Sequence, residues 1–209
     1  MPIEAPVYPV GLVMRGKRCL VVGGGEVAAR KATGLVEAEA QVHVVAEEVR
    51  PAMTQVRGLA SIEERRYRRG EAAGYWLVVA ATGDPSANQA VYDDGEAAGV
   101  WVNSADDPGR CSLVLPAVAR QGPVSVAIST SGYSPALASW LKGHVTEHLG
   151  PEVALLAELL AAARAELRGS GRSTEEVDWR PALGWDMLDL IRQGRQAEAK
   201  ERVEACLSQ

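Results

Sequence analysis

Three consecutive glycines, Gly23, Gly24 and Gly25, separate a short apolar run from a segment typical of a helix. With Ala28 they form a Gly-x-Gly-x-x-Ala pattern, in which the first glycine permits a tight turn and the second lets a pyrophosphate approach the backbone. The N-terminus of the following helix offers free N–H groups and partial positive charge to a phosphate. The pattern predicts dinucleotide binding, and a purely structural glycine turn is the alternative.

Two acidic residues, Glu47 and Glu48, directly follow the second apolar run of the chain. An acid at this place accepts hydrogen bonds from ribose hydroxyls and repels a 2′-phosphate, so it favours NAD over NADP. Both residues are also compatible with solvated charges at the start of the next helix. Thr82 follows a later apolar run and either contacts the cofactor or forms a plain turn.

Asp106 lies just beyond another short apolar run, where a reacting carboxylate of such a sheet is expected. A carboxylate there can act as a general base, which contributes on the order of 10² to 10⁴ in rate. The alternative is that Asp106 or Asp107 merely forms the turn before Pro108, and the residue types alone favour that turn. We expect Asp107 to be a turn residue.

His144 and His148 are four residues apart on a predicted helix, a spacing that can hold a metal ion. No third ligand is evident nearby in the sequence. Two exposed histidines are therefore the preferred interpretation, and we expect no structural metal.

The elements that position these residues alternate between strands and helices. Strand 18–22, helix 26–39 and strand 41–46 have the size of a βαβ unit, which implies parallel strands and a right-handed crossover. A short helix within 49–58, strands 60–67, 75–81 and 100–102, and a helix over 86–98 continue the pattern. Alternation of this kind predicts an α/β fold with a doubly wound parallel sheet.

The pattern changes after residue 109. Runs 112–120 and 123–129 predict an antiparallel strand pair, and Ser134-Pro135 opens a helix that reaches about residue 149. Residues 152–167 are strongly helical, a capping box at Ser173 and Glu176 predicts another helix start, and short helices follow. We therefore expect domains over 1–112, 113–150 and 151–209.

Composition narrows the function class. The chain has 209 residues, a net charge of −5 and three scattered cysteines. An acidic chain is unlike a general nucleic-acid binder, and an odd set of distant cysteines is typical of reduced thiols in a cytoplasm. The first residues resemble no signal peptide, and no apolar run is long enough to predict a membrane span.

Several motifs together resemble precorrin-2 dehydrogenases, including the dehydrogenase/ferrochelatases and the N-terminal half of siroheme synthase. The matching segments are YPVGL at 8–12, GK at 16–17, VVGGGEVAARK at 21–31, AAT at 80–82, VNSADDP at 102–108 and ISTSGYSPALA at 128–138. Their order and spacing agree with the family over roughly residues 8 to 150.

The resemblance implies a Rossmann-like NAD-binding domain, a central α+β dimerisation segment, a helical C-terminal domain and a homodimer. It implies NAD-dependent oxidation of precorrin-2 to sirohydrochlorin, and some family members also insert ferrous iron to give siroheme. Asp106 matches the catalytic aspartate of the family. Glu26, Val27, Glu47 and Glu48 match positions that contact NAD.

A substrate with many carboxylates needs cations and N–H donors in its pocket. The residues that we expect to bind it, with surface exposure as the alternative for each, are Asn103, Arg110, Ser129, Thr130, Ser131 and Lys142. Arg120 is a further candidate. Other hypotheses are an NAD-binding regulatory module without turnover, such as a redox sensor, and a purely structural dimer.

Overall fold

The structure is a computed structural model, and it describes residues 6–105 and 107–208. Asp106, the expected catalytic residue, therefore lies outside the described residues. The chain divides into two compact units. The first extends to Leu115 and includes Ser131–Ser134, and the second comprises Pro116–Thr130 and the chain from Pro135 onward.

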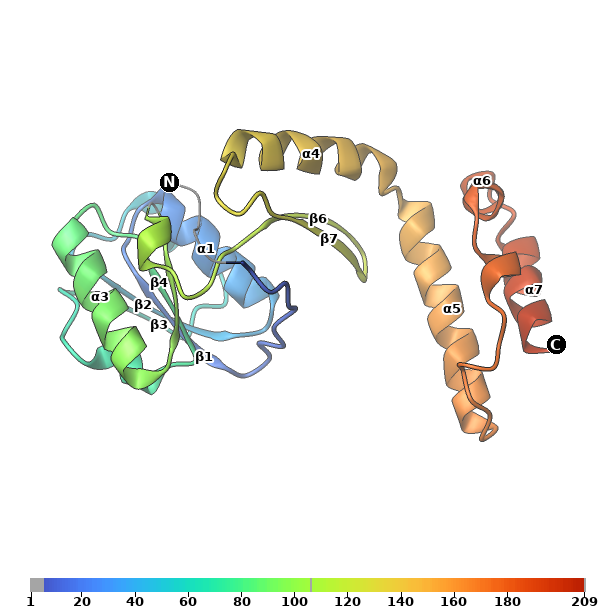
Figure 1. Cartoon of the computed structure of the whole chain (residues 1–209), viewed down its shortest axis with the longest axis horizontal. Coiled ribbons are helices and arrows are strands. Elements are labelled where there is room, and N and C mark those ends of the chain that lie inside the picture. Colours follow the sequence, from blue (N-terminus) through green and yellow to red (C-terminus); the bar gives the residue numbers. More distant parts are fainter. Residues whose placement is uncertain (1–5, 106, 209) are drawn as a thin grey trace. The chain divides into compact units, whose positions relative to one another are not determined.

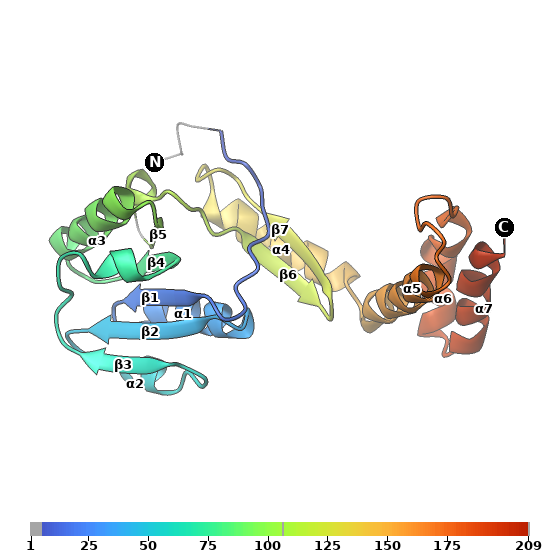
Figure 2. The same cartoon turned by 90° about the horizontal axis from the view of Figure 1, so that it is seen from below.

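A five-stranded parallel sheet forms the centre of the first unit. The strands are β1 (Arg18–Val22), β2 (Gln41–Ala46), β3 (Ser61–Glu64), β4 (Leu77–Ala80) and β5 (Trp101–Ser104). Their order in the sheet is β3-β2-β1-β4-β5 (Figure 2), which confirms the predicted doubly wound topology. The chain adds β2 and β3 on one side of β1 and then β4 and β5 on the other side, so the strand order reverses between β1 and β4. Ligands of such folds bind at this reversal of strand order.

Helices cover both faces of this sheet (Figure 1). The helix α1 (Glu26–Glu37) packs on one face, where its Ala28, Ala32 and Leu35 join alternate strand residues in a buried cluster. The helix α3 (Pro85–Ala98) packs on the other face through Val91. Strands with buried side chains on both faces are continuous apolar runs, which explains why the sequence predicts them well.

Short helices follow three strands of the first unit, β2, β3 and β5. They are α2 (Pro51–Thr54), η1 (Glu71–Gly74) and η2 (Pro108–Arg110). The predicted strand 60–67 is shorter in the structure and ends at Glu64. Its neighbour β2 ends at Ala46, opposite Glu64 in the register, so the pairing partner of β3 ends there.

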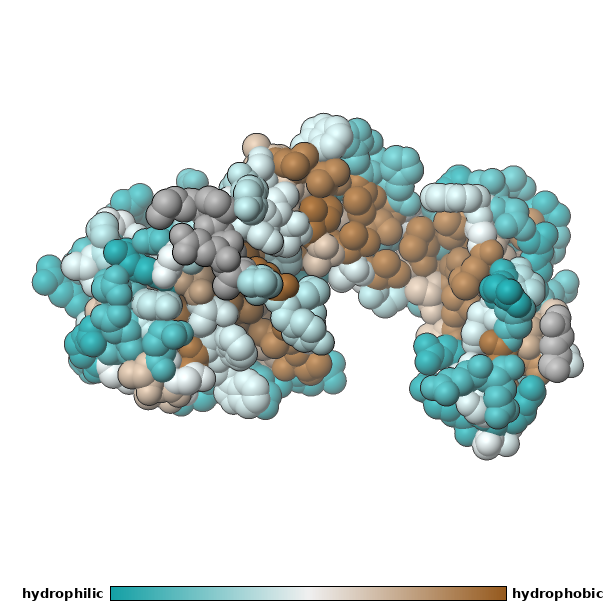
Figure 3. Space-filling view, in the orientation of Figure 1, coloured by the Kyte–Doolittle hydropathy of each residue, from teal (hydrophilic) through white to brown (hydrophobic). Residues whose placement is uncertain are grey.

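The second unit begins with an antiparallel hairpin of β6 (Ala117–Gln121) and β7 (Val124–Ile128), as predicted. The helices α4 (Pro135–His148) and α5 (Pro151–Gly169) follow, and α4 starts at the predicted proline. Apolar atoms gather on the visible side of this unit around the hairpin and the adjoining helices (Figure 3).

The remaining elements are η3 (Arg180–Ala182), α6 (Trp185–Arg192) and α7 (Gln196–Leu207). They pack with α5 around a cluster that includes Met187 and Val203. Short helices in this region are confirmed.

The capping box predicted at Ser173 and Glu176 is wrong, because residues 173–176 form turns and start no helix. The Ser173 hydroxyl accepts a hydrogen bond from the Glu175 amide at 3.2 Å. The indole of Trp179 donates to the Thr174 carbonyl at 3.2 Å. A hydroxyl that bonds the amide two residues ahead stabilises a turn in place of a helical start.

Two further expectations concern boundaries and membranes. The continuous part of the first unit extends to Leu115, and the predicted divisions at residues 112 and 150 stay predictions. Within the ranges that the structure describes, no helix is both long and apolar enough to cross a bilayer.

Candidate functional site

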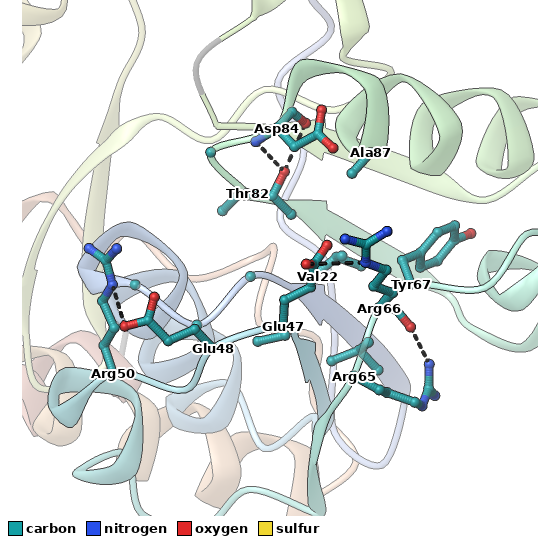
Figure 4. Close-up of a pocket in the computed structure, with 17 residues that line it drawn as sticks. Val22, Glu47, Glu48, Arg50, Arg65, Arg66, Tyr67, Thr82, Asp84 and Ala87 are labelled. Carbon is teal, nitrogen blue, oxygen red and sulfur yellow. Dashed lines mark hydrogen bonds and ion pairs between the residues drawn. The ribbon is translucent and has the colours of Figure 1, made fainter.

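A cavity of about 440 Å³ lies in the first unit at the carboxyl ends of the parallel strands (Figure 4). Four loops build it, because the segments after β1, β2, β3 and β4 converge at the point where the strand order reverses. Its lining residues are Val22–Gly25, Val45–Glu48, Arg50, Arg65–Tyr67, Ala81–Asp84 and Ala87. The predicted cofactor residues Gly23, Gly24, Gly25, Glu47, Glu48 and Thr82 are all among them.

The three glycines of the turn meet different surroundings. Gly23 has φ +130° and a Cβ atom there would overlap the Ala81 carbonyl. A Cβ atom on Gly24 would overlap the Glu48 carbonyl, whereas one on Gly25 would meet nothing within 4 Å. Gly23 and Gly24 therefore allow close backbone packing, and Gly25 leaves the open backbone that a pyrophosphate needs.

The helix α1 begins directly after this open glycine. Gly25 is its N-cap residue and makes no side-chain capping bond. Glu26 and Val27 form the first turn but are not among the residues that line the cavity. Their predicted contact with the cofactor stays a prediction. The first-turn amides of a helix bind phosphate through the backbone, so such a contact does not require their side chains to line the cavity.

The two acids after β2 are both ion-paired with arginines (Figure 4). The Glu47 carboxylate lies 3.2 Å from Arg66 Nε, and the Glu48 carboxylate lies 3.6 Å from Arg50 Nε. These arginines are missing from the sequence-based candidates. Arg66 follows the carboxyl end of β3, so the topology of the sheet supplies the signal that places it here.

Arg65 fixes the segment that follows β3. Its guanidinium contacts Glu71 at 2.6 Å and Glu63 at 2.8 Å, and these hydrogen bonds hold the pKa of Arg65 well above its ordinary value. It also donates to the Arg66 carbonyl at 3.0 Å. The Arg65 side chain is thus bound by Glu63, Glu71 and the Arg66 carbonyl, while the neighbouring Arg66 side chain reaches the cavity.

Thr82 is both a lining residue and part of a turn. Its hydroxyl lies 2.7 Å from the Asn88 amide oxygen, and the Asn88 Nδ2 donates to the Thr82 carbonyl at 3.3 Å. Asp84 caps α3 by accepting from the Ser86 amide at 2.8 Å, and hydrogen bonds from Ser86 lower the pKa of Asp84. The two alternatives for Thr82, turn and cofactor wall, are therefore compatible.

The predicted substrate residues near β5 are held by protein groups. Asn103 is 5% exposed and donates to the Leu113 carbonyl at 2.9 Å. Among the described residues, its buried Oδ1 atom has no hydrogen-bond partner. Arg110 donates to Gln89 at 2.6 Å and pairs with Asp107. Asp107 accepts from the Gly109 amide at 2.9 Å, which confirms its predicted role in a turn.

Four other expected substrate residues come from the end of the hairpin and from α4. Ser129 and Thr130 directly follow β7, and Lys142 lies within α4, all in the second unit. Ser131 belongs to the first unit and has φ +48°. Their part in substrate binding stays a prediction.

The two histidines of α4 contact residues of their own helix. His148 Nδ1 lies 2.8 Å from the His144 carbonyl, and the His144 ring packs edge-on against Trp140 with centroids 4.2 Å apart. Within residues 6–105 and 107–208, no group of three or more His, Cys, Asp or Glu residues could hold a metal ion.

Comparison with protein families identifies the cavity-bearing unit. Residues 10–117, more than half of the chain, match a family described as putative NAD(P)-binding. The chain belongs to this NAD(P)-binding family. Residues 121–148 of the same NAD(P)-binding protein match a second family, described as sirohaem biosynthesis protein central. The first match covers every residue that lines the cavity, so the cavity lies within the NAD(P)-binding domain.

The relatives of this NAD(P)-binding protein confirm the resemblance. A siroheme synthase from Nitrosococcus oceani is 34% identical over 203 residues, covering 95% of this chain and 43% of the relative. A siroheme synthase from Methylococcus capsulatus is 35% identical over 200 residues, covering 93% and 42%. The chain thus spans about two fifths of the length of these relatives.

A solved structure shows that the fold is shared. The protein named SirC, precorrin-2 dehydrogenase, superposes with a TM-score of 0.71 at 23% sequence identity. The superposition covers 97% of this chain and 100% of the SirC chain. The predicted combination of a Rossmann-like domain, a small α+β segment and a helical region is therefore confirmed as a fold.

Proposed function

We propose that this chain oxidises precorrin-2 to sirohydrochlorin with NAD as the hydride acceptor. One observation carries the proposal. The cavity in the NAD(P)-binding domain has an open backbone at Gly25, and the chain is similar to siroheme synthases along most of its own length. These relatives give no support to a regulatory module without turnover.

NAD is the proposed cofactor because Glu47 directly follows β2, where an acid accepts the ribose hydroxyls. When bound, the nicotinamide supplies the hydride-accepting carbon. The residues of this chain bind and orient the dinucleotide through the amides after β1, with Thr82 as a further lining residue beside the turn.

Oxidation of precorrin-2 removes a hydride, which leaves to the nicotinamide, and a proton, which leaves to a base. We propose that the base is the carboxylate of Asp106, which directly follows Ala105 in the sequence, shortly after β5. The substrate carboxylates would be held by Asn103, Arg110, Ser129, Thr130, Ser131 and Lys142. Hydrogen bonds from such donors to carboxylates are about twice as strong as those between neutral groups.

We further propose that the enzyme is a homodimer. The helix α4 exposes Leu137 at 47% and Trp140 at 60%, one turn apart. Large exposed apolar residues that cluster on one surface are typical of protein interfaces.

We also propose a cytoplasmic location for the enzyme. The free thiols of Cys19, Cys111 and Cys206 support this location, because thiols stay reduced in a cytoplasm.

An absorbance assay tests the proposed reaction. Precorrin-2 and NAD are mixed with the chain, and the formation of sirohydrochlorin and NADH is recorded. Asp106→Ala is expected to lower the rate by about 10² or more while NAD still binds. Asp107→Asn is the matched control and should retain most of the activity. A folded, NAD-binding chain that leaves precorrin-2 unchanged would refute the proposal.

The same assay with ferrous iron decides whether the chain also inserts the metal. Iron here is a substrate, and siroheme has its own absorbance spectrum. Siroheme formed above the rate without protein would add a chelatase activity to the oxidation. Sirohydrochlorin as the sole product would assign iron insertion to another protein.

A further inference from the structure

We infer that Arg66 is a specificity-determining residue at the adenosine end of the cofactor cavity. By neutralising Glu47, it lets the site accept the 2′-phosphate of NADP as well as the 2′-hydroxyl of NAD. The inference rests on the proposed function, because it requires a dinucleotide bound along the turn after β1.

The position of Glu47 locates the ribose. An acid at the carboxyl end of the second strand is the usual partner of the 2′-hydroxyl, and Glu47 directly follows Ala46, the last residue of β2. Arg66 comes from the adjacent strand β3, and its Nε lies 3.2 Å from the Glu47 carboxylate. The two side chains point toward one another at the cavity wall (Figure 4).

Exposure makes the Arg66 guanidinium available to a ligand. The side chain of Arg66 is 84% exposed and that of Glu47 is 57% exposed. A solvated ion pair is weak, so a ligand phosphate can replace the carboxylate as the partner of the guanidinium. Arginine suits this exchange because its planar fork binds phosphate through two parallel hydrogen bonds.

The backbone of Arg66 is held in place by its neighbour. Arg65 Nη1 donates to the Arg66 carbonyl at 3.0 Å, while the rest of the Arg65 guanidinium is bound to Glu63 and Glu71. The Arg65 guanidinium is therefore bound by protein groups, and Arg66 is the arginine of this segment whose guanidinium can change its partner from Glu47 to a ligand phosphate.

The other acid of this region is also compensated. Glu48 lies 3.6 Å from Arg50 Nε. A lone acid near the ribose would repel a 2′-phosphate, whereas two acids that each face an arginine leave the local charge near zero. The acid pair by itself predicts strict NAD specificity, and the two arginines weaken that discrimination.

Calorimetric titration of the full chain with NAD⁺ and NADP⁺ tests the inference. We expect the two dissociation constants of the unchanged chain to lie within about tenfold of each other. Arg66→Gln should weaken NADP⁺ binding by about tenfold or more and change NAD⁺ binding little. Glu47→Gln should have the opposite effect, with NADP⁺ bound more tightly than NAD⁺.

Arg69→Gln is the matched control, because Arg69 pairs with Asp94 at 2.9 Å and is not among the cavity-lining residues. It should leave the ratio of the two constants unchanged. An unchanged ratio in Arg66→Gln, with circular dichroism showing a folded protein, would overturn the inference alone. A folded chain that binds neither dinucleotide would instead overturn the proposed function.

Discussion

The backbone of Gly24 packs directly against the carbonyl oxygen of Glu48, and no space remains between them for a Cβ atom. The amide of Arg50 reinforces this contact by donating to the Gly24 carbonyl at 3.1 Å. The turn after β1 and the segment after β2 thus form one continuous wall of the cavity. That wall carries both the proposed phosphate site and the acids Glu47 and Glu48.

Replacement of Gly24 by alanine should disrupt this wall. The added methyl group would force the Glu48 backbone away, and overpacking of this kind costs about 1–3 kcal/mol. We expect a lower free energy of unfolding in urea titrations and a weaker affinity for NAD⁺. A variant with wild-type stability and affinity would show that the two segments are not in contact.

Replacement of Gly25 by alanine should separate binding from stability. Gly25 has φ −86° and open space around its Cβ direction, so alanine fits the backbone. The unfolding free energy should change by less than about 0.5 kcal/mol. The methyl group would stand where the pyrophosphate approaches, so the NAD⁺ dissociation constant should rise about tenfold or more. Unchanged affinity would place the phosphates elsewhere.

The carboxyl of Asp178 should titrate at unusually low pH. Hydrogen bonds from the Arg180 side chain and backbone lower the pKa of Asp178 from 3.8 to about 2. Because the folded-state pKa is depressed, the stabilisation is complete above pH 3.8 and is lost as the pH falls through about 2. An NMR titration of the Asp178 carboxyl carbon measures this midpoint, and Arg180→Gln should return it toward 3.8.

The pairing of Glu152 with Arg192 should stabilise the second unit. The Glu152 side chain is only 9% exposed and contacts Arg192 Nη2 at 2.5 Å. Arg192→Gln would leave a mostly buried carboxylate without its cation, so we expect the thermal midpoint to fall by roughly 3 °C. Arg195→Gln removes a pair in which both side chains are about half exposed, and it should shift the midpoint by less than about 1 °C. Equal shifts in the two variants would contradict this assignment.

The sequence predicts the sheet and the glycine turn because local signals specify them. Buried parallel strands are short apolar runs, and the pattern from Gly23 to Ala28 occurs in its expected place between β1 and α1. The residues that follow strands in such a sheet are also predictable, and Glu47, Glu48 and Thr82 all line the cavity.

The pairing of Arg66 with Glu47 could not be found from local patterns. Arg66 meets Glu47 only because β3 pairs with β2 in parallel, and that pairing joins residues 19 positions apart in the sequence. The capping pattern at Ser173 failed for the opposite reason. It is a local signal, and the Ser173 hydroxyl instead bonds the Glu175 amide within a turn.

The contacts of Arg65 have a consequence for hydrogen–deuterium exchange. One guanidinium joins Glu63 at the end of β3, the Arg66 carbonyl, and Glu71, whose carboxylate also accepts the Arg68 amide at 3.0 Å. Local opening of this connection must break several bonds together, so its amides should exchange through a cooperative event and not by fraying. A surface loop at the edge of the sheet would then show the protection normally found in regular secondary structure.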